Sequence, residues 1–278
     1  MPEEPRVIWG GSLHSTLSFY DGPAENLKVL LESEGLTPDE ILDKLPFRSA
    51  RSRAVEATRP DGKRYRDLRQ VYQTAGLLYE ESERVRLTEL GRVTSRWLAL
   101  WNEQNIVVLG RHAAYALAAA QLRNPTRAGQ KYAADMEVFP FAFIWRAMLA
   151  LRGKINSDEL NRAIFAVRNE RDLENAIADI RHYRMYGGDP DEVLGPETET
   201  GENKNDRIIP WMSIASFGWT IINDKSSGPD GEHYTIPSRT LTLIREAARA
   251  RHKHRDFDSV GEYVEHISAA AALPRDLR

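Results

Sequence analysis

Arginine is concentrated in one short stretch of the N-terminal third of the chain. Between positions 48 and 69 there are eight basic residues, seven of them arginine, and only three acidic ones. A cation that neutralises a phosphate releases counterions, and a guanidinium group can also bond guanine bidentately in the major groove. The stretch therefore predicts a surface for double-stranded DNA, with a solvent-facing helix covered by salt bridges as the alternative. The predicted contacts here are Arg48, Arg51, Arg53, Lys63, Arg64, Arg66, Arg69 and Gln73.

Cations that could also reach DNA occur at three further places. The predicted contacts there are Arg84, Arg86, Lys225, Arg251 and Lys253. The first two alternate with Val85 in a short strand, so both point away from the core, either toward DNA or as an ordinary exposed face. Lys225 lies in a long turn. The last two belong to "REAARARHKHR", which is either a phosphate-contacting tail or a solvated helix end.

Patterns typical of catalysis or metal binding are absent from the sequence. His252 and His254 are two positions apart on a predicted helix, so their rings point to different sides and do not share an ion. Asp61 and Lys63 resemble one part of a nuclease site, but no following strand supplies the second carboxylate needed for Mg²⁺. The chain also lacks cysteine, glycine-rich phosphate loops and a nucleophile elbow. We expect no cofactor and no metal; an enzymatic activity, if present, would be that of a DNA endonuclease with an unrecognised site.

Composition and charge place the chain among ordinary globular proteins. Of 278 residues, 41% are hydrophobic and 28% charged, and the net charge is −3. This charge argues weakly against a protein that coats nucleic acid everywhere, but not against a local basic face. No run is long enough to cross a bilayer and no secretory signal is seen, which predicts a cytoplasmic protein. The acidic segment at 187–206 is expected to be a flexible insertion.

The elements of the first hundred residues follow a recognisable order. Helices are expected at 24–35 and from 38, after the N-cap Thr37, and a third runs from Asp61 to Thr74. Gly76 ends that helix, the strands "LLYE" and "RVRL" form a hairpin, and Thr88 caps the next helix. Three helices, a two-stranded hairpin and a helix are the order of a winged helix-turn-helix, in which the basic helix before the hairpin enters the major groove.

The second half repeats this architecture but not its residues. Helices are expected at about 141–151, after Ser157 and after Asn169, followed by the strands "WTII" and "HYTI" and a final long helix from Ser238. The aromatic segments "FPFAFIW" and "PWMSIASFGW" read first as core, and second as a pocket for a flipped or modified base. The predicted fold is mainly α with small β-wings: winged-helix modules at 1–103 and 136–278, joined by a long central helix within 104–135.

The stretch "YRDLRQVYQTAGLLYEESERVRLTELGR" resembles the helix and wing of winged-helix DNA-binding domains. Together with "FPFAFIWRAMLALRGKINSDEL…ERDLENAIADI", it also resembles the DNA-recognition part of AlwI-like restriction endonucleases. The nuclease core of that family is not found here. The resemblance implies a tandem winged-helix fold and a DNA-recognition role.

The sequence thus predicts a protein that binds double-stranded DNA at a specific sequence or modified base, as a transcriptional regulator or as the target-recognition module of a restriction or defence system. A nuclease partner and a homodimer are further expectations. The alternatives are an endonuclease with an unrecognised active site and a protein-interaction scaffold.

Overall fold

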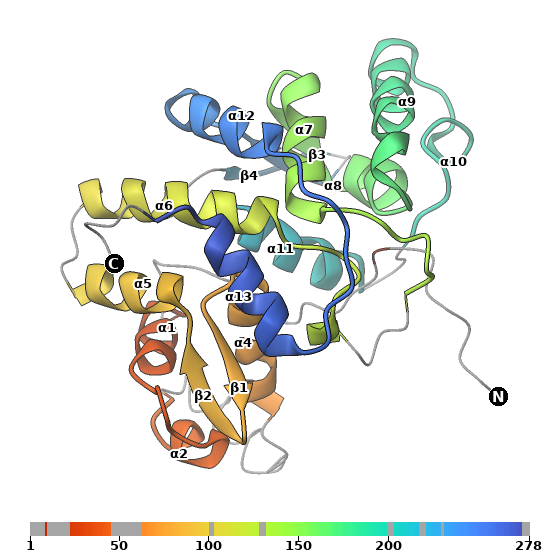
Figure 1. Cartoon of the computed structure of the whole chain (residues 1–278). Helices are drawn as coiled ribbons and strands as arrows, with labels where there is room; N and C mark the ends of the chain where they lie inside the picture. The colour runs from red at the N-terminus through yellow and green to blue at the C-terminus, as the bar shows by residue number, and fades with distance from the viewer. Residues whose placement is uncertain are drawn as a thin grey trace.

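The computed structural model describes most of the chain and is mainly helical. The described residues are 9, 23–45, 63–99, 103–127, 132–198, 203–216, 221–228 and 231–273. Within them the strands form two small antiparallel sheets, one of two strands and one of three. The predicted fold class, mainly α with small β-hairpins, is confirmed (Figure 1).

The N-terminal half contains the predicted hairpin between helices. Its elements are α1 (Pro23–Leu31), α2 (Pro38–Leu42), α4 (Lys63–Thr74), β1 (Leu78–Glu81), β2 (Arg84–Leu87) and α5 (Glu89–Ala99). Gly76 has φ 74°, the left-handed conformation expected after the end of α4. Ser82 and Glu83 also have positive φ, 51° and 60°, as a two-residue hairpin turn of the primed type requires. The short gap between the strands therefore acts as the predicted turn.

The remaining elements lie above and across this half in Figure 1. They are α6 (Glu103–Ala118), η1 (Pro125–Arg127), α7 (Pro140–Ala150), β3 (Lys154–Asn156), α8 (Ser157–Glu159), the π-helical η2 (Leu160–Ile164), η3 (Glu170–Asp172), α9 (Leu173–Tyr186), α10 (Pro190–Val193), α11 (Asn203–Ala215), β4 (Ile222–Gly228), β5 (Gly231–Thr235), η4 (Ser238–Thr240), α12 (Leu241–Arg249) and α13 (Val260–Ala270). The long helix α6 runs between the two halves and packs on α5, α7, α12 and α13. The described aromatic residues of the two segments are core, as predicted: Phe141, Trp145 and Trp211 are all buried, whereas Phe217 and Trp219 lie outside the described residues.

The architectural repeat extends to the residues at one place. "LTPDEI" at 36–41 and "INSDEL" at 155–160 each form a capping box, in which a Glu side chain accepts from the N-cap backbone N–H and the N-cap side chain accepts from the Glu N–H. The residue before each N-cap pairs with the second strand of a hairpin: Leu36 with Val85, and Ile155 with Tyr234. Both halves thus share the same arrangement of capping box and hairpin, whereas the sequence indicated only a similar order of elements.

Several boundaries in the second half differ from the predictions. Lys154–Asn156, between two of the expected helices, is a strand, β3, that was not predicted; it pairs with β5 in the sheet order β3-β5-β4. The strand β4 runs to Gly228, through much of the predicted turn. The helix that was predicted to be the last one, from Ser238, ends at Arg249 as α12, and residues 250–257 are not helical.

The acidic segment is not a free insertion over the part that the structure describes. Arg162 forms ion pairs with Asp191 and with Glu197, the latter at 3.1 Å, and Leu194 is buried. The flexibility expected of this segment stays a prediction, but residues 191–198 contact η2 despite their low apolar content. The physical reason is a partly buried arginine that two of the carboxylates neutralise.

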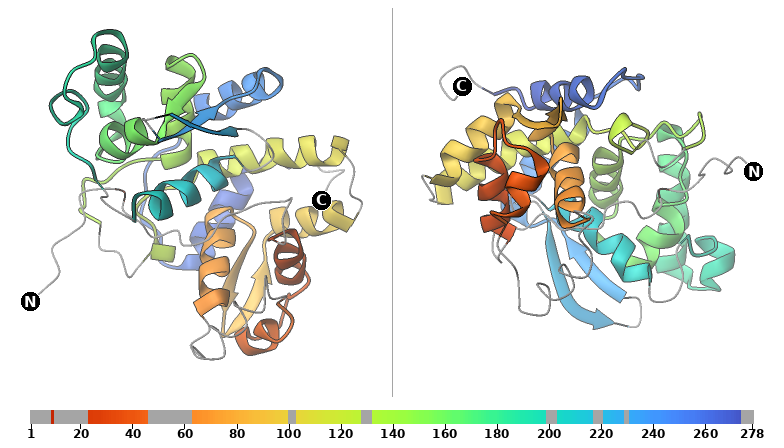
Figure 2. Two further views of the ribbon diagram at one scale, coloured as in Figure 1. Left: turned by 180° about the vertical axis from the view of Figure 1, so that it is seen from behind. Right: turned by 90° about the horizontal axis from the view of Figure 1, so that it is seen from below.

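The C-terminal helix α13 was not predicted, and it packs on the N-terminal half. It lies against β1, α5 and α6, and the β4–β5 hairpin projects on the opposite side of the molecule (Figure 2). The Leu90 backbone N–H donates to Ser268 Oγ at 3.1 Å, and a ring nitrogen of His112 lies 2.8 Å from the Ala271 carbonyl. One face of the β1–β2 hairpin is therefore partly covered by a helix that lies far from it in sequence.

Candidate nucleic-acid interface

The helix predicted to read DNA, α4, exposes fewer of its polar side chains than expected. Arg66 is exposed. Arg69 forms an ion pair with Glu80 of β1, and the Tyr65 hydroxyl donates to the same carboxylate at 2.6 Å. Burial and this carboxylate raise the pKa of Tyr65 well above its ordinary value, so the phenol stays protonated. Gln73 is buried, with 6% of its surface exposed, which corrects the prediction that it faces solvent.

The hairpin arginines lie on the predicted face but bind groups of the protein. Arg84 Nη1 donates to the Gly35 carbonyl at 2.6 Å, and Arg86 Nε lies 3.3 Å from Glu81 Oε2. The strand register places both on the face opposite Val85, as the alternation predicted. Arg84 thus holds the hairpin to the turn before α2, and Arg86 is paired within the hairpin, so neither cation is fully available to a ligand.

Several predicted contacts fall outside what the structure describes. Arg48, Arg51 and Arg53 lie outside the described residues. The side chains of Lys63, Arg64 and Lys225 do too, although their backbones belong to α4 and β4.

The basic segment near the C-terminus is the most accessible cluster of cations that the structure describes. Arg245, Arg249, Arg251 and Lys253 are all exposed, and none of the four has an ion pair or side-chain hydrogen bond with the described residues. Arg245 and Arg249 are four positions apart on α12 and so lie on one face. Only Arg251 and Lys253 were predicted; the i, i+4 spacing in "REAAR" could have identified the other two.

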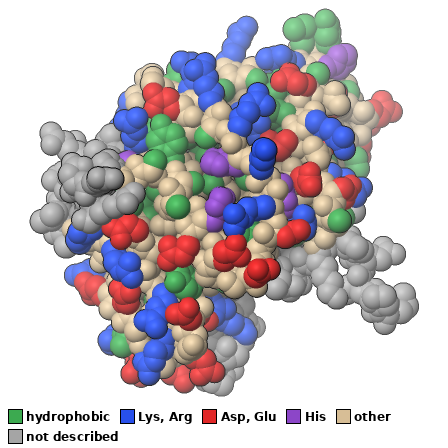
Figure 3. Space-filling view, in the orientation of Figure 1, with side chains coloured by type: hydrophobic (Ala, Val, Ile, Leu, Met, Phe, Trp, Pro, Cys, Tyr) green, Lys and Arg blue, Asp and Glu red, His purple; other side chains and the backbone are tan. Residues whose placement is uncertain are grey.

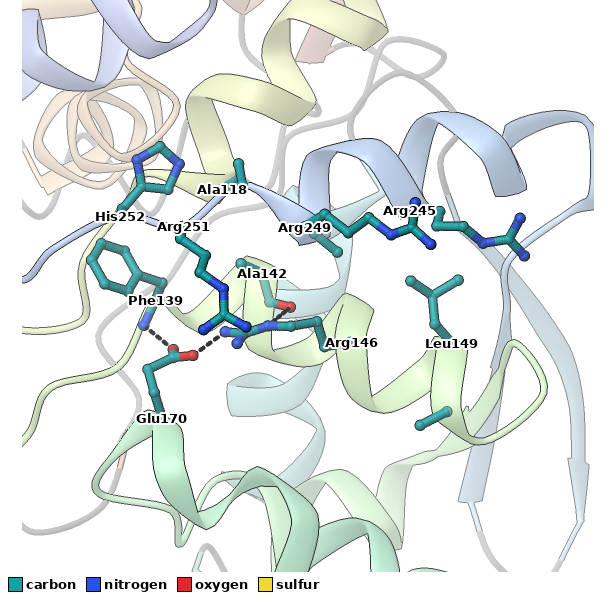
Figure 4. Close-up of a pocket in the computed structure, with 13 residues that line it drawn as sticks. Ala118, Phe139, Ala142, Arg146, Leu149, Glu170, Arg245, Arg249, Arg251 and His252 are labelled. Atoms are coloured by element: carbon teal, nitrogen blue, oxygen red, sulfur yellow. Dashed lines mark hydrogen bonds and ion pairs between the residues drawn. The ribbon is translucent and has the colours of Figure 1, made fainter.

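These arginines border a cleft between α7 and α12 (Figure 4). It has a volume of about 640 Å³. Its lining residues are Ala118, Phe139, Ala142, Arg146, Leu149, Ala150, Glu170, Arg245, Ala248, Arg249, Ala250, Arg251 and His252. On the α7 side, Arg146 forms an ion pair with Glu170, and Glu170 also accepts from the Phe139 backbone N–H at 2.8 Å. The charge of Arg146 is thus neutralised, and the unpaired charge belongs to the three arginines on and after α12.

The two histidines after α12 face the same way, contrary to the prediction. Because residues 250–257 are not helical, His252 and His254 both pack on Phe139, with ring centroids at 5.7 and 6.3 Å. Burial lowers the pKa of each below its ordinary value, helped by His266 for His252 and by Arg123 for His254. The rings are therefore neutral at pH 7, and the positive charge of this segment belongs to Arg and Lys. Across the described part of the chain, no group of three or more acidic or histidine side chains is placed to hold a metal ion.

Basic and acidic side chains occupy different parts of the visible face of the molecule. In Figure 3, Lys and Arg side chains gather over the upper part of the molecule, which holds α7 and α12, with histidines near the centre and carboxylates across the region below them. The surface beside the cleft is thus locally positive although the chain as a whole is slightly negative.

Among the described helices, none combines the length and apolar character needed to span a bilayer.

One solved structure has a similar fold over almost the entire length of both chains. It is the crystal structure of pyrene- and phenanthrene-modified DNA in complex with the BpuJ1 endonuclease binding domain. The match has a TM-score of 0.58 at 11% identity and covers 93% of this chain and 96% of that chain. No family model and no curated protein matches this chain. At this identity the likeness establishes a shared fold.

Proposed function

We propose that this chain is a double-stranded DNA-recognition domain of the kind that directs a restriction endonuclease. The observation that carries the proposal is the likeness in fold, which extends over nearly all of both chains, to an endonuclease binding domain solved with DNA. The exposed, unpaired arginines beside α12 support it, because a phosphate-binding surface needs cations that the protein has not already neutralised. A nuclease partner or domain would then supply cleavage. Transcriptional regulation is the less favoured role.

The two halves would act as tandem winged-helix modules joined by α6. In the first, α4 precedes the β1–β2 hairpin and would enter the major groove, with Lys63, Arg64 and Arg66 toward DNA. Arg69 would act indirectly, because its ion pair with Glu80 fixes α4 against the hairpin. In the second module the β4–β5 hairpin with Lys225 projects from the body and would reach the duplex, alongside Arg251 and Lys253.

Binding to duplex DNA should be measured by fluorescence anisotropy between about 50 and 200 mM salt, with a pool of random duplexes and with the best sequence selected from it. We expect affinity to fall steeply with salt, since each phosphate contact contributes about 0.9 to the log–log slope. Lys63→Ala/Arg64→Ala/Arg66→Ala should weaken binding roughly 10- to 100-fold and lower that slope. Arg69 is left in place so that the fold of the hairpin is not disturbed.

A control that removes cations outside α4 is available on the mixed-charge surface of η3 and α9. Arg171→Ala/Arg181→Ala removes two exposed cations there and should leave the affinity and the salt slope near those of the unmodified protein. Equal binding by the α4 variant and the unmodified protein would reject α4 as the reading helix. No binding to any duplex at low salt would reject the function itself.

A further inference from the structure

The α7–α12 cleft has the size of a small-molecule site and not of a duplex-binding channel. Its volume of about 640 Å³ lies in the range of ligand pockets, roughly 300 to 1,000 Å³. A B-form duplex, whose major groove alone is about 12 Å wide, is far larger than this space. An occupant of the cleft is therefore a single small group, free or extruded from a larger molecule.

The open side of the cleft favours an anion. Arg245 and Arg249 extend from one face of α12, and Arg251 follows from the next segment toward the α7 side (Figure 4). None of the three is neutralised by a described residue, whereas Arg146 across the cleft is paired with Glu170. In Figure 4, Arg251 points toward Arg146 and Glu170, whereas Arg245 and Arg249 extend along α12, so unpaired guanidinium groups follow the rim of the cleft. Each of them is suited to bind a phosphate, which a guanidinium can contact bidentately.

The interior of the cleft favours a flat, partly apolar group. Alanine residues form much of its walls, namely Ala118, Ala142, Ala150, Ala248 and Ala250, and their small side chains leave the space open. Phe139 and the neutral His252 add aromatic surface, and His252 Nε2 has no hydrogen-bond partner among the described residues. Bases stack on aromatic rings and on guanidinium planes, and they need polar partners at their edges.

We propose that the α7–α12 cleft binds one nucleotide, with its phosphate on the rim that carries Arg245, Arg249 and Arg251 and its base between the alanine walls beside Phe139. When the nucleotide belongs to DNA, the inference rests on the proposed function, and the cleft receives an unpaired or extruded nucleotide next to the bound duplex. A free nucleotide would occupy the same groups as a small-molecule ligand. The two sources share their chemistry and are separated by experiment.

Calorimetry with the four deoxynucleoside monophosphates, the matching nucleosides and inorganic phosphate tests the chemistry. Monophosphates should bind more tightly than either part alone. Arg249→Ala/Arg251→Ala should weaken this binding about tenfold or more, since each lost charged contact contributes on the order of 1.4 kcal/mol, a factor of ten. Ala250→Trp, at a half-buried, non-helical position in the wall, fills the cleft without changing charge and should also abolish binding. As a control, Lys28→Ala/Lys44→Ala removes two exposed cations of the N-terminal half that do not line the cleft, and this variant should bind as the unmodified protein does.

Duplexes with and without one unpaired nucleotide then identify the source. If Ala250→Trp weakens binding of the unpaired duplex and leaves the fully paired duplex unchanged, the nucleotide comes from DNA. If only free monophosphates respond to Ala250→Trp, the cleft is a site for a free nucleotide. Absence of monophosphate binding at millimolar concentration, together with unchanged DNA binding by Ala250→Trp, overturns the proposal. In that case, duplex binding that still depends on α4 would leave the proposed DNA-recognition function intact. Conversely, if monophosphates bind and no duplex does, the DNA-recognition function is rejected and the nucleotide site in the cleft is retained.

Discussion

Glu159→Ala is expected to lower the free energy of unfolding by about 2–3 kcal/mol. Glu159 is 1% exposed, and its carboxylate accepts from Arg184 Nε at 2.6 Å, from Arg184 Nη2 at 2.7 Å and from the Asn156 backbone N–H at 3.0 Å. Removing it leaves Arg184 Nε and the buried Asn156 backbone N–H without their acceptor. Urea unfolding followed by circular dichroism measures the loss.

The repeat supplies a matched control for this substitution. Glu40 occupies the same position in the N-terminal capping box, where its carboxylate accepts from the Thr37 backbone N–H at 2.7 Å, but it is exposed and no described arginine hydrogen-bonds to it. Glu40→Ala should therefore destabilise the protein much less than Glu159→Ala. Equal losses for the two variants would show that the capping box, and not the buried pair with Arg184, accounts for the effect.

Gly91→Ala is expected to cost about 3 kcal/mol of stability, despite the higher helix propensity of alanine. A Cβ atom at Gly91 would lie 2.0 Å from the Leu77 carbonyl oxygen, which is backbone and cannot rotate away. The same carbonyl accepts from the Thr88 backbone N–H at 3.1 Å, so moving it disturbs the junction between the hairpin and α5. Thermal unfolding should show a clearly lowered Tm.

Gly261→Ala is the corresponding control in α13. Its added Cβ would approach the Tyr79 ring at 3.0 Å, a half-buried side chain that can shift by a few tenths of an ångström. Alanine also favours the helix, so the net change in stability should be small. If both glycine variants lost the same stability, the close approach of α5 to Leu77 would not be the cause of the Gly91 effect.

The sequence was informative where neighbouring residues determine the structure. The left-handed glycine at 76, the short turn after β1 and the Thr88 cap together predicted the first hairpin and the helix after it. The stretch that resembles a wing ends in "TELG" at 88–91, and the close approach of Gly91 to Leu77 gives a physical reason for the glycine there. Local rules of this kind need no knowledge of distant segments.

Features set by distant contacts were not predicted. The strand β3 exists because it pairs with β5, some 80 residues later, and Leu194 is buried because Arg162 draws the acidic segment onto η2. The helix α13 carries an ordinary signal, with Ser259 as N-cap and Tyr263, Val264 and Ile267 on one face, but its place against the first hairpin depends on the whole fold.

In the candidate interface, too, local sequence predicted some features, and others depend on distant contacts. Alternation along β2 correctly placed Arg84 and Arg86 on one face, yet their partners Gly35 and Glu81 follow from the folded hairpin. Counting arginines located the N-terminal basic stretch but not the pairing of Arg69 with Glu80. The cleft beside α12 requires α7 and the segment after α12 to meet, which no local pattern encodes.

Hydrogen exchange with and without a selected duplex tests the central claim most directly, because it reports which backbone segments DNA covers. The account predicts slower exchange in α4 and in residues 245–253 when the duplex is added, with α9 unchanged. Unchanged exchange in both of those segments, under conditions where the duplex is shown to be bound, would contradict it.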